Sequence, residues 1–196
     1  MTMSTLDYYN NHAKDYFDFT VNADMQTQYD AFLKYVKREG KILDFGCGSG
    51  RDSLYFKNKG YNVTAIDGSE EMCKIAREYT GLDVKCMNFS DFNETNSYDG
   101  IWACGTLLHV KRKEVLNMLI KLRDALTENG HIFTAFKNGT GEEITKDGRY
   151  YCYFDLDEME DLTNQANLDT VLVYMSRSVN NPNEEKYWNN FVLKKR

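Results

Sequence analysis

The stretch from Lys41 to Gly50, Lys-Ile-Leu-Asp-Phe-Gly-Cys-Gly-Ser-Gly, constrains the fold more than any other part of this sequence. Its first half is typical of a buried parallel strand, which is a short apolar run bounded by turn residues. The glycines that follow allow positive φ and let a ligand approach the backbone without meeting a Cβ. A helix starting at Arg51 would point its free N–H groups at the same loop. The stretch therefore predicts a strand, a loop and a helix that hold a ligand.

The spacing of the glycines distinguishes two classes of nucleotide-like ligand. The dinucleotide fingerprint Gly-x-Gly-x-x-Gly/Ala has a small third residue where the helix packs on the strand. Counted from Gly46, that place holds Arg51, whose guanidinium suits a carboxylate better than close packing. The next apolar run, residues 61–66, leads to Asp67, whose carboxylate can accept hydrogen bonds from both hydroxyls of a ribose. We therefore expect a ligand with a ribose and a carboxylate rather than a pyrophosphate.

Four ordered segments resemble the class I S-adenosylmethionine-dependent methyltransferases: residues 42–51, 63–69, 98–104 and 126–136. One glycine loop alone would be a weak match, whereas four matches in the family's order are specific. The runs Gly-Ser-Gly-Arg-Asp-Ser, Trp-Ala-Cys, Leu-Leu-His-Val and Gly-Arg-Tyr-Tyr resemble, more narrowly, a bacterial small-molecule branch that includes tellurite-resistance-type enzymes. The resemblance implies S-adenosyl-L-methionine as the cofactor. It also implies an α/β, Rossmann-like fold with a seven-stranded, mostly parallel sheet, a C-terminal antiparallel hairpin and a helical N-terminal lid.

The hydrophobic pattern along the chain alternates between strands and helices. Strands are expected at 42–46, 62–66, 83–87, 98–104, 131–136, 169–179 and 188–195. Helices are expected within 1–40, where Gly40 ends the last one, and at 51–59, 69–79, 111–127 and 155–166. A polar, glycine-bearing loop after Phe136 is expected to border a substrate pocket, and Asn180-Asn-Pro-Asn183 is a turn signal.

The length of 196 residues suits one well-cored domain and is short for two. We expect a single domain over 1–196. It would comprise a helical lid (1–40), a cofactor-binding core (41–136), and a substrate-side loop, helix and hairpin (137–196).

Charge and composition argue against several partners. With 24 Lys and Arg against 30 Asp and Glu, the net charge of −6 disfavours binding to a nucleic-acid backbone. No run approaches the roughly 20 apolar residues of a membrane span, and no signal-peptide pattern is visible. The five cysteines have no zinc-site spacing, which indicates a reducing compartment and no metal. We expect a cytoplasmic protein that binds a small-molecule methyl acceptor; its oligomeric state stays open.

The resemblance assigns cofactor-binding roles to positions of the quoted motifs. Asp67 is expected to bind the ribose, and Asp44, inside the first strand, to organise the glycine loop by accepting its backbone N–H groups. The other expected cofactor contacts are Tyr16, Gly46, Gly48, Gly50, Arg51, Gly68, Ser69, Asn88, Phe89, Ala103 and Cys104. For Asn88 and Phe89, an ordinary strand end and a core side chain stay open as alternatives. Packing is the simpler interpretation of Cys104.

The acceptor side offers fewer signals. His109 is the candidate general base, because it titrates near neutral pH and follows the strand beside the methyl donor. A histidine that caps or packs the next helix is the alternative. Arg149 and Tyr150 are candidates for binding an anionic substrate group, with Thr20 as a weaker contact, although a surface ion pair explains Arg149 equally well. The N-terminal aromatic residues, Tyr16 first, either cover the sulfonium or pack on the sheet.

We therefore expect transfer of the sulfonium methyl group to an O, N or S atom of a small molecule by in-line displacement. Two other classes stay open. An NAD-dependent oxidoreductase would share the glycine loop and Asp67, but would be expected to have Gly or Ala in place of Arg51. A non-catalytic S-adenosylmethionine-binding regulator would keep the whole cofactor site.

Overall fold

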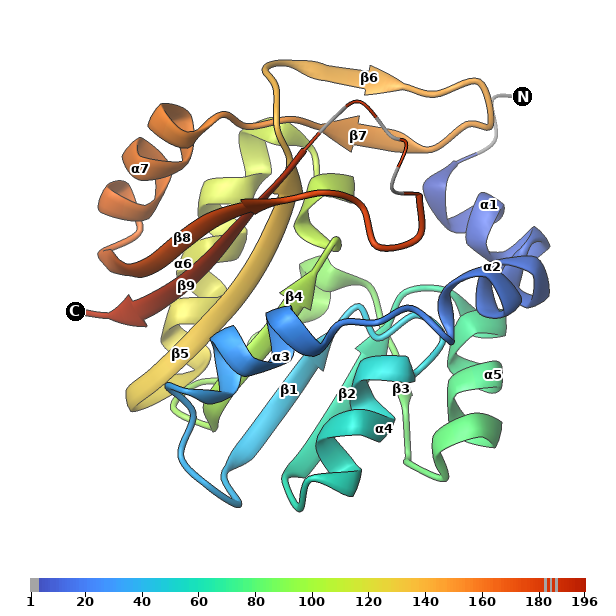
Figure 1. Ribbon diagram of the computed structural model, residues 1–196, viewed down its shortest axis with the longest axis horizontal. Helices are drawn as coiled ribbons and strands as arrows, with labels where there is room; N and C mark the ends of the chain where they lie inside the picture. The colour runs from blue at the N-terminus through green and yellow to red at the C-terminus, as the bar shows by residue number, and fades with distance from the viewer. Residues whose placement is uncertain (1–3, 182, 184, 186) are drawn as a thin grey trace.

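The computed structural model describes residues 4–181, 183, 185 and 187–196. Within these residues, seven strands form one sheet in the order β3-β2-β1-β4-β5-β9-β8 (Figure 1). Neighbouring strands are parallel from β3 to β5 and antiparallel from β5 to β8. The strands are β1 (Lys41–Phe45), β2 (Asn62–Asp67), β3 (Lys85–Cys86), β4 (Tyr98–Cys104), β5 (Leu126–Lys137), β8 (Leu168–Ser176) and β9 (Trp188–Lys195). The expected mostly parallel sheet with an antiparallel C-terminal pair is confirmed.

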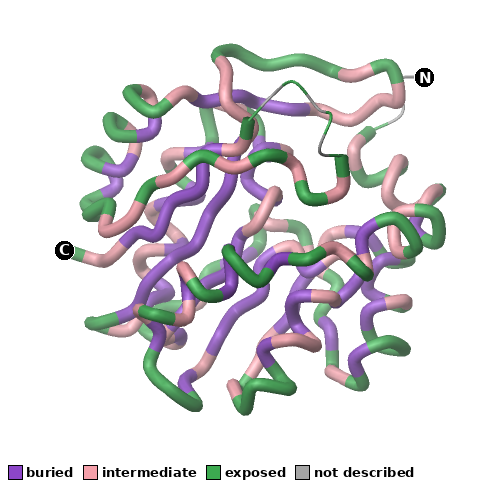
Figure 2. Tube along the Cα trace, viewed as in Figure 1, coloured by how far each residue is buried: buried purple, intermediate pink, exposed green. Residues whose placement is uncertain are grey.

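The middle strands are buried on both faces, as the purple trace in Figure 2 shows, because helices cover each face. On one face, α3 (Gln26–Leu33) and α4 (Arg51–Asn58) pack on Ile42, Trp102 and Phe133. On the other, α6 (Val115–Ala125) and α7 (Leu156–Gln165) pack on a larger cluster that contains Leu43, Phe45 and Ile101. Alternate residues of one strand therefore serve two cores, as a buried parallel strand requires.

Helix α5 (Glu70–Thr80) shows how local sequence sets an element that borders the site. The Ser69 hydroxyl accepts a hydrogen bond from the backbone N–H of Met72, and Glu70 and Glu71 lie at the positive end of the helix dipole. Gly81 ends the helix in the left-handed conformation. The Ser-Glu-Glu pattern thus fixes where the chain leaves β2 and turns into the helix.

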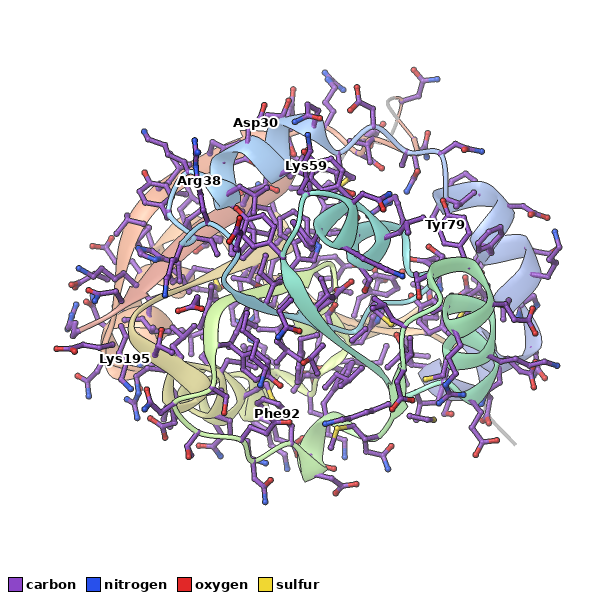
Figure 3. All side chains as sticks on the ribbon, turned by 90° about the horizontal axis from the view of Figure 1, so that it is seen from below. Asp30, Arg38, Lys59, Tyr79, Phe92 and Lys195 are labelled. Carbon is purple, nitrogen blue, oxygen red and sulfur yellow. The ribbon has the colours of Figure 1, made fainter. Side chains whose placement is uncertain are left out.

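Two short N-terminal helices, α1 (Thr5–Asn11) and α2 (Ala13–Thr20), lie against α5. The rings of Phe17 and Tyr79 meet edge to face, with their centroids 5.2 Å apart. Tyr79 is labelled in Figure 3. The Asn10 carboxamide accepts a hydrogen bond of 2.6 Å from the Ser69 hydroxyl. The expected helical N-terminal segment is thus present in the described residues, and it is tied to the start of α5.

Some boundaries differ from the sequence expectation. Strand β5 begins at Leu126, because the backbone there already pairs with Tyr98 of β4. The helix expected at 111–127 is a 3-10 turn over Arg112–Glu114 followed by α6, and α3 ends at Leu33 well before Gly40. The expected turn at 180–183 includes Pro182, which lies outside the described residues.

The loop expected after Phe136 instead contains a hairpin of β6 (Glu142–Ile144) and β7 (Tyr150–Cys152). The Tyr150 hydroxyl bonds the Glu142 carboxylate across it at 2.6 Å. Figure 1 shows this hairpin at the end of the sheet toward which β1 and β4 point.

Candidate active site

The site lies at the carboxyl ends of β1 and β4, where the chain order reverses on the two sides of β1. In open α/β sheets, ligands bind at such a switch point. Gly46 has a φ of 82°, and a Cβ there would overlap the Thr106 side chain. The N–H groups of Gly46 and Cys47 both bond the Ile66 carbonyl at 2.9 Å. These hydrogen bonds hold the glycine loop over the end of β2, and space stays open beside β4.

A cavity of about 490 Å³ opens at this loop, and we call it the glycine-loop cavity. It is lined by Thr5, Leu6, Tyr9, Tyr16, Gly46, Gly48, Asp67, Gly68, Met72, Asn88, Phe89, Ser90, Cys104, Gly105, Thr106, His109, Val110, Lys111, Glu114 and Met118. Its volume falls in the range of small-molecule and cofactor sites.

Asp67, the last residue of β2, lines that cavity. Its two oxygens accept the backbone N–H groups of Gly48 and Ser69, each at 2.9 Å. Burial raises the pKa of Asp67, while the backbone N–H groups of Ser69, Gly48 and Gly68 oppose the rise. A carboxylate has about four lone-pair sites, so Asp67 keeps acceptor capacity for hydroxyl groups of a ligand.

The two ends of the glycine-loop cavity differ in character. Leu6, Met72, Phe89 and Met118 make one end apolar, and Asn88 adds an amide there. A Cβ on Gly68 would lie 3.0 Å from Leu6, so the lid helix α1 closes tightly over this end. Elsewhere the lining includes Cys104, Gly105 and His109, which also line a second cavity.

This second cavity, of about 330 Å³, lies between the N-terminal helices, β5 and β9, and we call it the aromatic cavity. Tyr9, Tyr16, Phe19, Tyr151 and Trp188 contribute its rings. The two cavities meet at a junction formed by the residues that line both: Tyr9, Tyr16, Cys104, Gly105 and His109. The two cavities are therefore adjacent at these residues.

His109 is held at the junction by both ring nitrogens. Its Nδ1 lies 2.7 Å from the Tyr150 carbonyl oxygen, and its Nε2 lies 2.9 Å from the Tyr9 hydroxyl. Because a carbonyl only accepts, Nδ1 carries the proton and Nε2 of the neutral ring accepts from Tyr9. Burial lowers the pKa of His109 to about 4, although the hydrogen bond to Tyr150 opposes this. His109 is therefore a neutral base with its lone pair aimed at a phenol.

A buried polar network lies beneath the glycine loop and centres on Asp52. Its carboxylate accepts hydrogen bonds from Tyr29 at 2.5 Å, from the Trp102 indole at 2.8 Å and from two nitrogens of Arg51 at 2.6 and 2.9 Å. Although burial opposes it, the Arg51 guanidinium holds the pKa of Asp52 below its usual value. The remaining Arg51 nitrogen donates to the Thr20 carbonyl at 3.2 Å. Asp52 thus fixes the direction of Arg51.

Asp44 does not have the partners expected from the sequence. Its carboxylate accepts the Ser53 hydroxyl at 2.5 Å, and the loop N–H groups go to Ile66 and Asp67 instead. Burial and the nearby charge of Asp52 raise the pKa of Asp44 to about 8. Asp44 is therefore a buried acid below the loop, outside both cavities.

Most of the expected cofactor residues reach the glycine-loop cavity: Tyr16, Gly46, Gly48, Asp67, Gly68, Asn88, Phe89 and Cys104. Three others are buried behind its lining, namely Gly50, Ser69 and Ala103. Arg51 lines the aromatic cavity, together with Thr20 and Arg149.

The Tyr150 side chain lies outside both cavities. It lines an outer groove that shares Thr5, His109 and Lys111 with the glycine-loop cavity, and its hydroxyl bonds Glu142 and the backbone N–H of Arg112. Its backbone, however, serves the site, because its carbonyl holds His109 and its N–H bonds the Thr5 hydroxyl of α1 at 2.9 Å.

Several lining residues carried no specific signal in the sequence. Tyr9 was one aromatic residue among many near the N-terminus, and Lys137, Tyr151 and Trp188 lie far apart in the chain. The aromatic run at the N-terminus indicated a lid but not which ring meets His109.

Within the described residues, no helix is both long enough and apolar enough to cross a membrane. A family model described as a methyltransferase domain matches residues 42–130. An uncharacterized methyltransferase of Staphylococcus carnosus is 26% identical over 89% of this chain and 96% of its own length. A probable S-adenosyl-L-methionine-dependent methyltransferase TehB of Haemophilus influenzae is 29% identical over 46% of this chain and 34% of its own.

Among solved structures, a similar fold is found in the 1,6-didemethyltoxoflavin-N1-methyltransferase of Burkholderia thailandensis, crystallised with 1,6-didemethyltoxoflavin and S-adenosylhomocysteine. The TM-score is 0.77 at 21% identity, and the match covers 97% of this chain and 84% of that one. At this identity the likeness concerns the fold.

Proposed function

Because the chain is a class I S-adenosylmethionine-dependent methyltransferase, we propose that it methylates a small molecule bound in the aromatic cavity. The observation that supports this most is the junction, where two cavities of about 490 and 330 Å³ share Cys104, Gly105 and His109. In-line displacement needs a donor and an acceptor that are aligned and close. Two adjacent cavities that share lining residues support such an arrangement.

The residues of the glycine-loop cavity fit the cofactor. Asp67 would bind the ribose hydroxyls, and Asn88 with Phe89 would take the adenine at the apolar end. Gly46 and Gly105 would let the methionine part lie against bare backbone. Arg51, fixed by Asp52 just across the junction, would take the carboxylate. When bound, S-adenosyl-L-methionine supplies an activated methyl group on a sulfonium.

The chain's own residues then align the acceptor and exclude water. For an acceptor that attacks through O–H or N–H, the Tyr9 oxygen would accept the acceptor's proton while the Tyr9 proton passes to Nε2 of His109. Before that transfer the His109 ring is neutral and its Nε2 already accepts the Tyr9 hydroxyl. The general-base role expected for His109 is therefore kept as a proposal, with Tyr9 placed between base and acceptor.

Methylation of a macromolecule is the outcome to exclude. Labelled S-adenosyl-L-methionine, incubated with the enzyme and with separated metabolite, protein and nucleic-acid fractions, should transfer label to the metabolite fraction. An Asp67→Ala enzyme serves as the background control, because it should bind the donor weakly. Label that enters only protein or nucleic acid would contradict a small-molecule acceptor.

A further inference from the structure

We propose that the aromatic cavity selects a planar organic anion, an aromatic or heteroaromatic acid, as the methyl acceptor. This inference rests on the proposed function, since it names the class of molecule that the acceptor side of that same site would hold. It is carried by the charge of the cavity lining, by the arrangement of its rings and by its size.

Among the described residues, the charged side chains that line the aromatic cavity are all cationic. Lys137, Arg149 and Arg177 line it beside Arg51, which pairs with Asp52 and would face the donor's carboxylate, and none of the described lining residues is Asp or Glu. The whole chain has more acids than bases, 30 against 24. A cavity lined by one sign of charge between low-dielectric walls concentrates ligands of the opposite sign. The lining therefore favours an anion although the protein itself is acidic.

The carboxylate partner of Arg149 stands outside the cavity. Arg149 bonds Asp147 through Nη2 at 2.6 Å, and Asp147 is not part of the lining. The guanidinium also lies over the rings of Tyr8 and Tyr151, with its carbon 4.3 and 5.4 Å from their centroids. Asp147 and the two rings thus orient Arg149 without placing a negative charge in the space the acceptor would occupy.

A second cation lies between two aromatic walls. The Lys137 ammonium is 5.1 Å from the centroid of Tyr151 and 5.6 Å from that of Trp188. Among the described residues, the buried indole nitrogen of Trp188 has no hydrogen-bond partner. Rings that flank cations offer stacking surfaces for a flat molecule and charge for its acidic group.

The size of the cavity limits the acceptor. At about 30 Å³ for each water-sized group, 330 Å³ holds on the order of ten such groups. This corresponds to one substituted aromatic ring rather than to a peptide or a nucleotide. An anion beside the sulfonium also keeps the pair neutral in a space with little water.

The test uses two matched pairs of probes, titrated calorimetrically into the enzyme saturated with S-adenosylhomocysteine. 4-Hydroxybenzoate and 4-hydroxybenzamide differ in charge, and benzoate and cyclohexanecarboxylate differ in planarity. We expect 4-hydroxybenzoate to bind at least about tenfold more tightly than 4-hydroxybenzamide, as one charge-assisted contact would give. We expect benzoate to bind about two- to tenfold more tightly than cyclohexanecarboxylate, because only the flat ring can stack on the aromatic walls. Equal affinities within the first pair would overturn the charge selection, and equal affinities within the second would overturn the planarity.

Arg149→Gln supplies the variant, and Arg123→Gln the matched control. Arg123 also bonds a neighbouring aspartate, at 2.7 Å, and its side chain is 19% exposed against 21% for Arg149, but it lies outside both cavities. The acid should lose about tenfold in affinity in Arg149→Gln and nothing in Arg123→Gln, with the amide unchanged in both. An unchanged acid affinity in Arg149→Gln would contradict the inference.

Binding of S-adenosylhomocysteine distinguishes a failure of the proposed function from a failure of the acceptor class. If the wild-type enzyme fails to bind it, the proposed function fails, and the inference that rests on it fails as well. If it binds normally and the acids show no preference, only the acceptor class is wrong.

Discussion

The glycine-loop cavity and the aromatic cavity are neighbours built in different ways. The first takes its central groups from short motifs at the ends of β1 and β2, such as Gly46, Gly48 and Asp67. The second joins side chains from α1, α2, β5 and β9, including Tyr9, Lys137 and Trp188. A ligand that many proteins share can be bound largely by backbone geometry. A specific acceptor is bound by side chains that only the folded chain brings together.

A mutation at the junction should distinguish the roles of the two cavities most clearly. Tyr9→Phe removes the phenol that bonds Nε2 of His109, so turnover of a protonated acceptor should fall about 10²-fold or more. The affinity for S-adenosylhomocysteine should stay close to that of the wild type, because the glycine-loop contacts remain. Single-turnover rates and calorimetric titration measure the two quantities. A single-turnover rate of Tyr9→Phe equal to that of the wild type would contradict proton transfer through Tyr9 to His109.

His109→Asn tests whether Tyr9 and His109 act as one unit. The double variant should then be no slower than the slower single variant. Additive losses would mean that the two side chains act separately.

Asp67→Ala should affect the glycine-loop cavity alone. Losing hydrogen bonds to a charged acceptor costs about 1.5–3 kcal/mol each, so affinity for S-adenosylhomocysteine should fall roughly tenfold or more. Asp83→Ala, an exposed acid in the next loop, is the control. If Asp67→Ala unfolds, Asp67→Asn keeps the shape of the side chain and should still weaken binding. Unchanged affinity in both Asp67 variants would remove the ribose assignment.

The pKa of His109 makes the junction sensitive to acid. The folded pKa of about 4 lies below the ordinary value of 6.5, because burial favours the neutral ring. The unfolded chain therefore binds the proton first, and the stabilisation is full above pH 6.5 and lost as pH falls toward 4. The melting temperature of the wild type should drop over this interval more than that of His109→Asn. Parallel curves for the two proteins would show that His109 is solvated in the folded state.

The smallest effect is expected at Tyr150, where backbone and side chain serve different places. Its carbonyl holds His109, whereas its hydroxyl bonds Glu142 at the outer groove. Tyr150→Phe keeps the backbone, so turnover and acceptor affinity should stay within about twofold, as for substitutions away from a site. Steady-state kinetics check this, and a large rise in KM would restore Tyr150 as a substrate contact.

The sequence predicted the parallel core well because its signals are local. The apolar runs of β1, β2 and β4 and the capping Ser69 each carry their information within a few residues. The β6–β7 hairpin was missed because its strands are three residues each, too short to show a periodic pattern, so they depend on cross-strand pairing such as that of Glu142 with Cys152. Likewise, the sequence did not indicate the polar network around Asp52, because its partners Tyr29 and Trp102 are separated from it by 23 and 50 positions.

The sequence by itself determined the parallel sheet, the glycine loop and the position of Asp67 at the end of β2, because glycine φ and strand periodicity are properties of neighbouring residues. Only the tertiary structure decided that Arg51 turns toward Asp52, that Tyr150 faces outward and that Tyr9 meets His109. The Tyr9–His109 contact joins residues 100 positions apart, and the other two are choices of side-chain direction that packing sets. For that reason the sequence indicated the methyl donor, whereas the charge and shape of the aromatic cavity became visible only in the fold.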